Sequence, residues 1–218
     1  MTFNYKTTVS MFYRIGNLAI RSPLSIRRPR KGEDCLVLKT SGSFPPAHPS
    51  TKAALTVLYC LKIKKEARIL DIGCGSGILG LAAALKNGAI TIGCDISPAS
   101  IKASMKNAIL NQRQGRFHLF CGSANAVSER FDLILANLPA SVHIQMFDHY
   151  RRLILINQGL LVVSGFYDVQ TAYMEKELAR KGFAVLERVE INASAAALTS
   201  ECSCTWVSLG LKYTASIK

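Results

Sequence analysis

The stretch ILDIGCGSGILG (residues 69–80) decides the fold, because an apolar run reaches Asp71 and then passes into four glycines within eight positions. An apolar run, a break and a second run at helical spacing predict a strand, a turn and a helix. Gly73, Gly75 and Gly77 let the backbone turn tightly and approach a ligand without intervening side chains. Because open α/β sheets bind ligands at such turns, the stretch predicts a ligand site at the carboxyl end of a strand.

Strand and helix patterns alternate on both sides of this turn. Near-continuous apolar strands separated by helices are typical of a largely parallel sheet that is covered on both faces. The last two strands have no helix between them, which predicts a hairpin at the sheet edge. The predicted fold is therefore α/β: a doubly wound, Rossmann-like, mostly parallel seven-stranded sheet with an antiparallel edge strand. The predicted strands are 68–72, 89–94, 117–121, 131–136, 160–166, 185–191 and 204–213, and the predicted helices are 49–63, 78–86, 97–109, 142–155 and 168–181.

Length and composition predict one packed domain with a short preface. The chain has 218 residues, 49% of them hydrophobic, which is enough for one sizeable core. Residues 1–45 are irregular and contain three prolines, although two apolar pieces at 15–20 and 35–38 could be edge strands. We therefore predict a basic N-terminal segment over 1–45 and a main domain over 46–218.

The positive charge lies mostly at the front of the chain. Of the 27 lysines and arginines, 13 fall in residues 1–70, against three acidic residues there. A cluster formed by Arg27, Arg28, Arg30 and Lys31 could bind phosphates or an acidic protein, or could be a solvated surface. The sequence leaves these alternatives open.

No membrane or secreted location is expected. The longest apolar runs are well below the roughly 18 residues that a membrane-spanning helix needs, and no signal-peptide pattern opens the chain. The seven cysteines are odd in number, lie mostly in apolar stretches and contain no Cys-x-x-Cys pair. A metal site at Cys202 and Cys204 would need two ligands from elsewhere. We expect a cytoplasmic protein with reduced cysteines and no metal.

The acids around the glycines favour a cationic nucleoside ligand. The carboxylate of Asp71 is suited to an ammonium group, and the chain has no Gly-Lys-Ser or Gly-Lys-Thr for phosphates. Asp95 ends the next strand, where an acid can bind both hydroxyls of a ribose, and Ile96 could cover an adenine. An amino acid joined to adenosine is S-adenosylmethionine. A Gly-x-Gly-x-x-Gly string over 75–80 keeps a nicotinamide oxidoreductase as the weakest alternative.

These residues carry a family resemblance. Asp71-x-Gly-x-Gly-x-Gly together with Asp95 resembles the nucleotide-binding motifs of class I methyltransferases. The stretches AHPSTKAAL (47–55), GCDISPASIKASMKNAILN (93–111), FDLILANLPA (131–140) and GLLVVSGF (159–166) resemble the catalytic domain of the ribosomal protein L11 methyltransferase family. That resemblance implies methyl transfer from S-adenosylmethionine to an amine of a ribosomal protein. It places Thr51 over the methionine end of the cofactor, Asn137 near the methyl group and Ser123 where relatives bind the adenine amino group.

Two departures from the family affect the substrate. The front segment is too short for the separate N-terminal domain with which the family presents its substrate. Ala140 also takes the aromatic position of a related Asn-Pro-Pro-aromatic motif, so a planar base or amide would lack a stacking surface, which favours an aliphatic amine.

A sulfonium is an activated methyl donor, so alignment of donor and acceptor is the main catalytic task. Asn137 and His143 are the candidate catalytic residues, and Tyr167 is a further candidate by position. The predicted function is methylation of a protein amine, most simply a lysine, on a protein partner for which a ribosomal protein is the candidate. An RNA methyltransferase, in which the basic front binds RNA, and a non-catalytic cofactor-binding protein are the alternatives.

Overall fold

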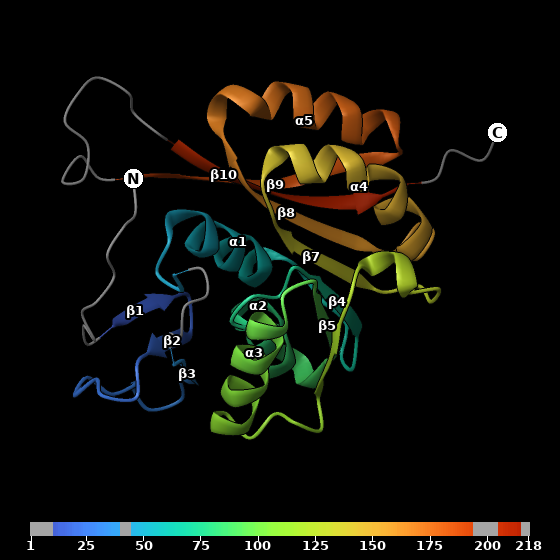
Figure 1. Ribbon diagram of the computed structural model, residues 1–218. Coiled ribbons are helices and arrows are strands. Elements are labelled where there is room, and N and C mark those ends of the chain that lie inside the picture. The colour runs from blue at the N-terminus through green and yellow to red at the C-terminus, as the bar shows by residue number, and fades with distance from the viewer. Residues whose placement is uncertain (1–10, 40–44, 194–204, 215–218) are drawn as a thin grey trace.

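The computed structural model describes residues 11–39, 45–193 and 205–214, which form two sheets and the helices around them (Figure 1). The small sheet contains β1 (Phe12–Ile15), β2 (Leu18–Arg21) and β3 (Asp34–Val37). The large sheet contains β4 (Arg68–Ile72), β5 (Ile90–Asp95), β6 (Phe117–Cys121), β7 (Leu133–Asn137), β8 (Leu160–Tyr167), β9 (Phe183–Asn192) and β10 (Thr205–Tyr213). The helices are α1 (Pro49–Cys60), α2 (Ile78–Leu85), α3 (Pro98–Leu110), α4 (Ala140–Leu153) and α5 (Asp168–Arg180), with short 3-10 turns at Lys86–Gly88 and Ala124–Ala126.

The large sheet has the strand order β6-β5-β4-β7-β8-β10-β9. Neighbouring strands from β6 to β8 pair in parallel, whereas β10 pairs antiparallel with both β8 and β9. The chain runs outward from β4 to β6 and then returns to place β7 on the other side of β4, so the strand order reverses at β4 and β7. The predicted seven-stranded α/β fold is confirmed, and the reversal marks the edge where such sheets bind ligands.

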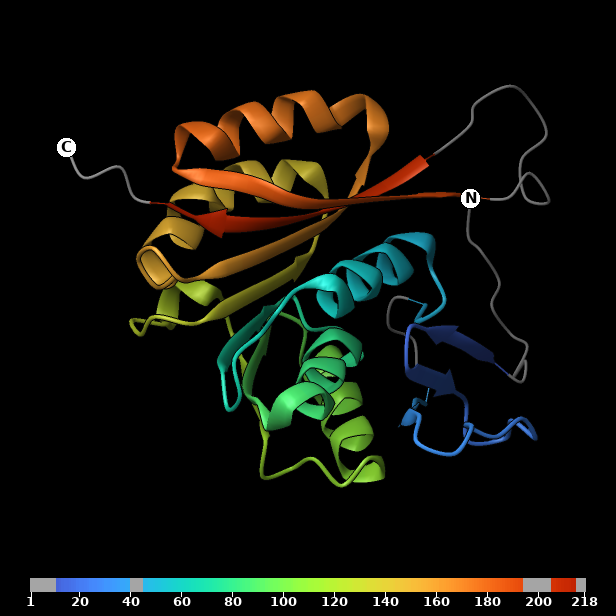
Figure 2. The same cartoon turned by 180° about the vertical axis from the view of Figure 1, so that it is seen from behind.

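Helices cover both faces of this sheet. α4 and α5 lie on one face, and α1, α2 and α3 lie on the other (Figures 1 and 2). Alternate residues of a strand point to opposite faces, and β4 follows this rule. Ile69 belongs to the core under α1 and α2, while Leu70 and Ile72 belong to the core under α4 and α5. Both faces of the strand are buried, which explains its continuous apolar sequence.

The small sheet packs on the α1–α3 side and shares that core. Leu18, Ile20 and Leu36 have no exposed surface and belong to the same apolar cluster as α1 and α2. The apolar pieces that we expected as edge strands form this separate sheet instead. The piece at 15–20 is interrupted because Gly16, with a φ of 53°, turns β1 into β2. The boundary near residue 45 stays a prediction.

Asn107 of α3 and Asn111, the C-cap residue of that helix, bind the outer edge of β3. The Asn111 side chain accepts from the Val37 N–H at 2.8 Å and donates to the Val37 carbonyl at 2.7 Å. The Asn107 carbonyl oxygen accepts from the Lys39 N–H at 2.9 Å, while its amide nitrogen donates to the Ser76 carbonyl at 2.9 Å. The small sheet is therefore attached through α3 to the glycine-rich turn.

No helix in the described ranges is both long enough and apolar enough to cross a bilayer. Cys202 and Cys204 lie outside the described residues.

Candidate functional site

A cleft follows the carboxyl ends of β4, β5, β7 and β8. It consists of three adjoining pockets that all include Gly73. The first contains Thr51, Asp71 and Asn137, and the second extends past Asn137 toward Tyr167 and Trp206. The third contains Asp95, Ile96, Ser123, Val142 and Met146. The cleft lies at the strand-order reversal, where the sequence predicted a ligand site.

The glycine-rich turn has the conformation that its composition predicts. Gly73, Gly75 and Gly77 have φ values of 69°, 55° and 80°, in the left-handed region that side chains strain. Gly77 is also the N-cap residue of α2. Gly80 serves packing, because a Cβ there would lie 2.7 Å from the Phe117 ring. Gly73, Gly75 and Gly77 therefore shape the turn, and Gly80 brings α2 close to the sheet.

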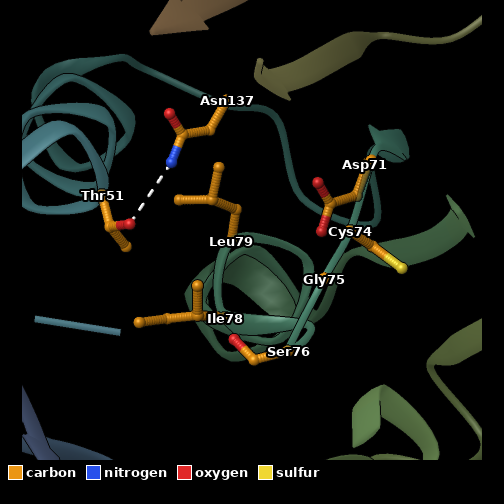
Figure 3. Close-up of a pocket in the computed structure, with 9 residues that line it drawn as sticks. Thr51, Asp71, Cys74, Gly75, Ser76, Ile78, Leu79 and Asn137 are labelled. Atoms are coloured by element: carbon orange, nitrogen blue, oxygen red, sulfur yellow. Dashed lines mark hydrogen bonds between the residues drawn. The ribbon is translucent and has the colours of Figure 1, made fainter. Parts of the chain in front are cut away.

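Asp71 is a buried carboxylate that faces the first pocket (Figure 3). Its Oδ2 accepts a hydrogen bond of 2.9 Å from the Gly80 N–H. Among the described residues, no lysine, arginine or histidine forms an ion pair with it. Burial, together with the negative charge of Asp95, raises the pKa of Asp71 to about 7. A cationic group bound in this pocket would provide the positive partner that the Asp71 carboxylate lacks among the described residues.

Thr51 and Asn137 meet across the same pocket although they lie far apart in the chain. Thr51 is in the first turn of α1, and Asn137 ends β7. The Asn137 amide nitrogen donates to the Thr51 hydroxyl oxygen at 3.3 Å, and Figure 3 shows the two side chains pointing toward each other. The hydrogen bond orients the Asn137 amide beside the Asp71 pocket.

Asp95 is fixed by backbone donors on both sides. Its Oδ2 accepts from the Gly75 N–H at 3.0 Å, and its Oδ1 accepts from the Ser97 N–H at 2.9 Å. Each carboxylate oxygen has a second lone pair for a hydroxyl donor. Ile96 is 80% exposed beside it, and the Ser123 hydroxyl oxygen accepts from the Asn125 N–H at 3.3 Å. The structure thus brings the predicted ribose and adenine residues together in one pocket.

His143 does not line any of the three pockets, so the structure does not bring this candidate catalytic residue together with the other predicted site residues. The ring is fully buried. Its Nδ1 bonds with the Tyr150 hydroxyl at 2.8 Å, and its Nε2 lies 2.8 Å from the Ser164 carbonyl. That carbonyl also accepts from the Leu138 N–H at 2.9 Å. Burial lowers the pKa of His143 to about 4, so the ring stays neutral and braces the turn after β7.

Three aromatic residues meet at the second pocket. Tyr167 and Trp206 line it, with their ring centroids 4.3 Å apart. The His48 ring meets Trp206 edge-on at 4.5 Å. Trp206 was missed as a site residue in the sequence. The alternating pattern of its strand predicts on which face of the sheet the side chain lies, but it does not predict which residues lie next to it. The antiparallel register of β10 and β8, which pairs Trp206 with Tyr167, supplies that neighbour.

The strand order, the glycine-rich turn after β4 and the acid at the end of β5 together define a class I methyltransferase fold. The family model for "Ribosomal protein L11 methyltransferase (PrmA)" matches residues 44–198. The chain belongs to this family.

Curated relatives carry the same name. The ribosomal protein L11 methyltransferase of Helicobacter pylori strain J99 is 30% identical over 163 residues, which are 73% of this chain and 48% of the relative. The protein of that name from Caulobacter sp. strain K31 is 27% identical over 166 residues, 74% of this chain and 57% of the relative. The chain therefore spans about half the length of the curated relatives it matches.

Solved structures agree on the fold. The ribosomal protein L11 methylase from Lactobacillus delbrueckii subsp. bulgaricus has a TM-score of 0.79 and 25% identity, with 94% of this chain and 99% of that chain covered. A putative RNA methyltransferase from Pyrococcus horikoshii has a TM-score of 0.65 at 16% identity, with 82% of this chain and 93% of that chain covered, and shows the fold alone.

Proposed function

We propose that this protein transfers a methyl group from S-adenosylmethionine to an amine of a protein, a lysine of a ribosomal protein being the first candidate. The observation that carries the proposal is the buried Asp71 carboxylate, without a cationic partner among the described residues, in one cleft with Asp95. Membership in the L11 methyltransferase family supports the reaction and the class of substrate.

In this proposal S-adenosylmethionine would extend through the first and third pockets of the cleft. Asp71 would bind the ammonium group, and Asp95 would accept from the ribose hydroxyls. Ile96, Val142 and Met146 give the third pocket an apolar lining suited to an adenine. When bound, this cofactor supplies a methyl group on a sulfonium, which is already activated for transfer.

Positioning is then the main contribution of the chain. The Thr51–Asn137 hydrogen bond fixes the Asn137 amide where the first and second pockets join. An acceptor amine would approach through the second pocket, and alignment at near-attack distance would account for a large share of the rate. No histidine in the described ranges lines the three pockets. Tyr167, which lines the second pocket, or water would therefore take the proton of a lysine ammonium before transfer.

The aromatic residues change one argument about the acceptor. Ala140 does line the second pocket, as its place after Asn137 predicted, but Tyr167 and Trp206 line it too. The aromatic surface missing at position 140 is therefore supplied from β8 and β10, and Ala140 no longer argues against a planar base. Aromatic rings also attract an alkylated ammonium, which suits an amine that is methylated repeatedly. The choice of a protein amine thus depends on the family and not on Ala140.

Replacing Asp95 by alanine should weaken cofactor binding by about 1 to 3 kcal/mol, because charge-assisted hydrogen bonds to hydroxyls are lost. Isothermal titration with S-adenosylhomocysteine measures the affinity. Asp168→Asn, an exposed acid at the start of α5, is the control and should bind as the parent does. An unchanged affinity of Asp95→Ala would remove Asp95 from the cofactor site.

Replacing Trp206 by alanine should lower kcat/KM for the acceptor about 10- to 100-fold and leave cofactor affinity within about twofold, because the acceptor pocket loses its largest aromatic surface. Trp206→Phe should keep most of the activity. Steady-state kinetics with a varied acceptor, together with cofactor titration, separates the two effects. An equal loss in both would place Trp206 in the cofactor site.

The proposed reaction is tested by transfer of labelled methyl from S-adenosylmethionine into undermethylated ribosomes, followed by digestion with protease or ribonuclease. Label that protease releases, mapped to a lysine by mass spectrometry, supports the proposal. Label that ribonuclease releases would make the protein an RNA methyltransferase. Cofactor binding without any transfer would support the non-catalytic alternative.

A further inference from the structure

The loop between β2 and β3, residues 22–32, carries a group of cationic side chains. None of its residues lines the cleft. Arg27, Arg28, Arg30 and Lys31 are all exposed. None of the four forms an ion pair with a carboxylate in the described part of the chain. We call these four residues the basic loop cluster.

The loop is held in place at both ends. At its start, the Arg21 guanidinium donates to the Ser25 carbonyl at 3.1 Å, and Ser25 is buried. At its end, the backbone N–H of Arg30 donates to Glu33 Oε2 at 2.6 Å, and the Glu33 N–H donates to the Arg30 carbonyl at 3.1 Å. The Arg27 guanidinium also lies 5.9 Å from the centroid of the Phe12 ring. The cluster is therefore presented on an anchored loop.

Glu33 interacts with one member of the cluster, because the hydrogen bond from the Arg30 N–H and, to a smaller extent, the Arg30 charge lower the pKa of that carboxyl, but its ion pair is with Arg14. Glu33 has only 7% of its side chain exposed, and its Oε1 is occupied by the Arg14 Nε at 2.8 Å. Residues 22–32 contain no acidic side chain of their own. A concentrated, unpaired positive surface attracts a polyanion, and arginine in particular binds phosphate oxygens through paired donors.

We propose that the basic loop cluster binds the phosphate backbone of RNA and so brings the protein to its substrate. The choice of RNA over other polyanions depends on the proposed function, because a ribosomal protein substrate is found with ribosomal RNA. Contacts to phosphates position a protein without reading sequence. The cluster would therefore increase the local concentration of the acceptor without taking part in methyl transfer.

The test uses the full chain and a fluorescein-labelled RNA hairpin, with fluorescence anisotropy over a range of salt concentrations. Four phosphate contacts predict that the parent loses affinity by roughly 100-fold between about 50 and 200 mM salt, since each contributes about 0.9 to the logarithmic slope. The variant Arg27→Gln, Arg28→Gln, Arg30→Gln, Lys31→Gln should bind at least about tenfold more weakly at the lower salt and show a much shallower slope.

A matched control removes the same charge elsewhere. Lys62, Lys65, Lys176 and Lys212 are exposed and form no ion pair within the described ranges. Their glutamine variant should bind the hairpin as the parent does. An equal loss in the control would show that net charge alone acts, and an unchanged loop variant would show that RNA binds elsewhere; either result overturns the proposal.

Two further probes identify other partners. Binding of the parent to anionic lipid vesicles or to poly-glutamate, without binding to the hairpin, would overturn the choice of RNA. The basic loop cluster variant and the lysine control variant should both bind S-adenosylhomocysteine with the affinity of the parent. That result would show that both variants are folded. Because hairpin binding is measured without methyl transfer, failure of this proposal is distinguishable from failure of the proposed reaction.

Discussion

Replacing Gly165 by alanine is expected to reduce methyl transfer by at least about 100-fold, because it displaces the turn at Leu138, which lines both the second and the third pocket. Gly165 lies in β8 with a φ of 98°. A residue with a side chain adopts this φ only with backbone strain. A Cβ there would lie 2.4 Å from the Leu138 carbonyl oxygen and 2.9 Å from the Leu138 carbonyl carbon. Backbone atoms cannot rotate aside as a flexible side chain can, so the turn after Asn137 must move.

The measurement compares methyl transfer, cofactor affinity and Tm for this variant. Gly115→Ala is the matched control, since nothing lies within 4 Å of a Cβ at that position. If Gly165→Ala unfolds, Leu138→Ala tests the same turn without adding an atom, and it should lower turnover while the protein stays folded. Activity within twofold of the parent in a folded Gly165→Ala would show that the position of this turn does not control the reaction.

Replacing Asp71 by asparagine is expected to stabilise the cofactor-free protein and weaken cofactor binding at the same time. The folded protein raises the pKa of Asp71 to about 7, whereas an unfolded chain has an aspartate pKa of about 3.9. The folded protein holds the Asp71 proton more tightly than the unfolded chain does, and this contributes to the free energy of unfolding. The contribution is fully present below about pH 4 and is lost as pH rises through about 7. Asparagine does not titrate. The free energy of unfolding of the variant should therefore exceed that of the parent by about 2 to 3 kcal/mol more at pH 8 than at pH 5.

Cofactor affinity should change in the opposite direction. At pH 8 the variant lacks the carboxylate that would bind an ammonium group, and its affinity for S-adenosylhomocysteine should fall about 10- to 100-fold. Below pH 7 the parent must lose a proton to bind, so the difference between parent and variant should shrink. Chemical denaturation and calorimetric titration at both pH values measure the two effects. Equal stability of parent and variant at pH 8 would contradict the raised pKa of Asp71.

Local spacing was enough to predict that Asp71, Asp95 and the glycine-rich turn line one cleft. Asp71 and the glycines are neighbours in sequence, and Asp95 ends the next strand, which pairs directly with β4. Parallel pairing of adjacent strands brings their carboxyl ends together, so no long-range information was needed.

Side-chain direction and distant pairing were not predictable in the same way. His143 follows Asn137 closely in sequence, but α4 begins at Ala140 and turns the histidine into the core with Phe147 and Tyr150. The spacing 143, 147 and 150 is itself a helical core pattern and could have indicated burial. Trp206 and Gly165 needed the register of β10 and the course of the turn after β7, which only the assembled sheet provides.

The asparagines beside β3 have a consequence for how copies of this protein behave in solution. An open strand edge invites another chain to add a strand, which is a common route to aggregation. Asn111 occupies both backbone groups of Val37, and Asn107 occupies the N–H of Lys39. These asparagine side chains thus take the place of a neighbouring strand. They occupy backbone groups that could otherwise pair with a strand of another copy. We therefore expect that copies of the protein do not associate through the β3 edge in concentrated solution.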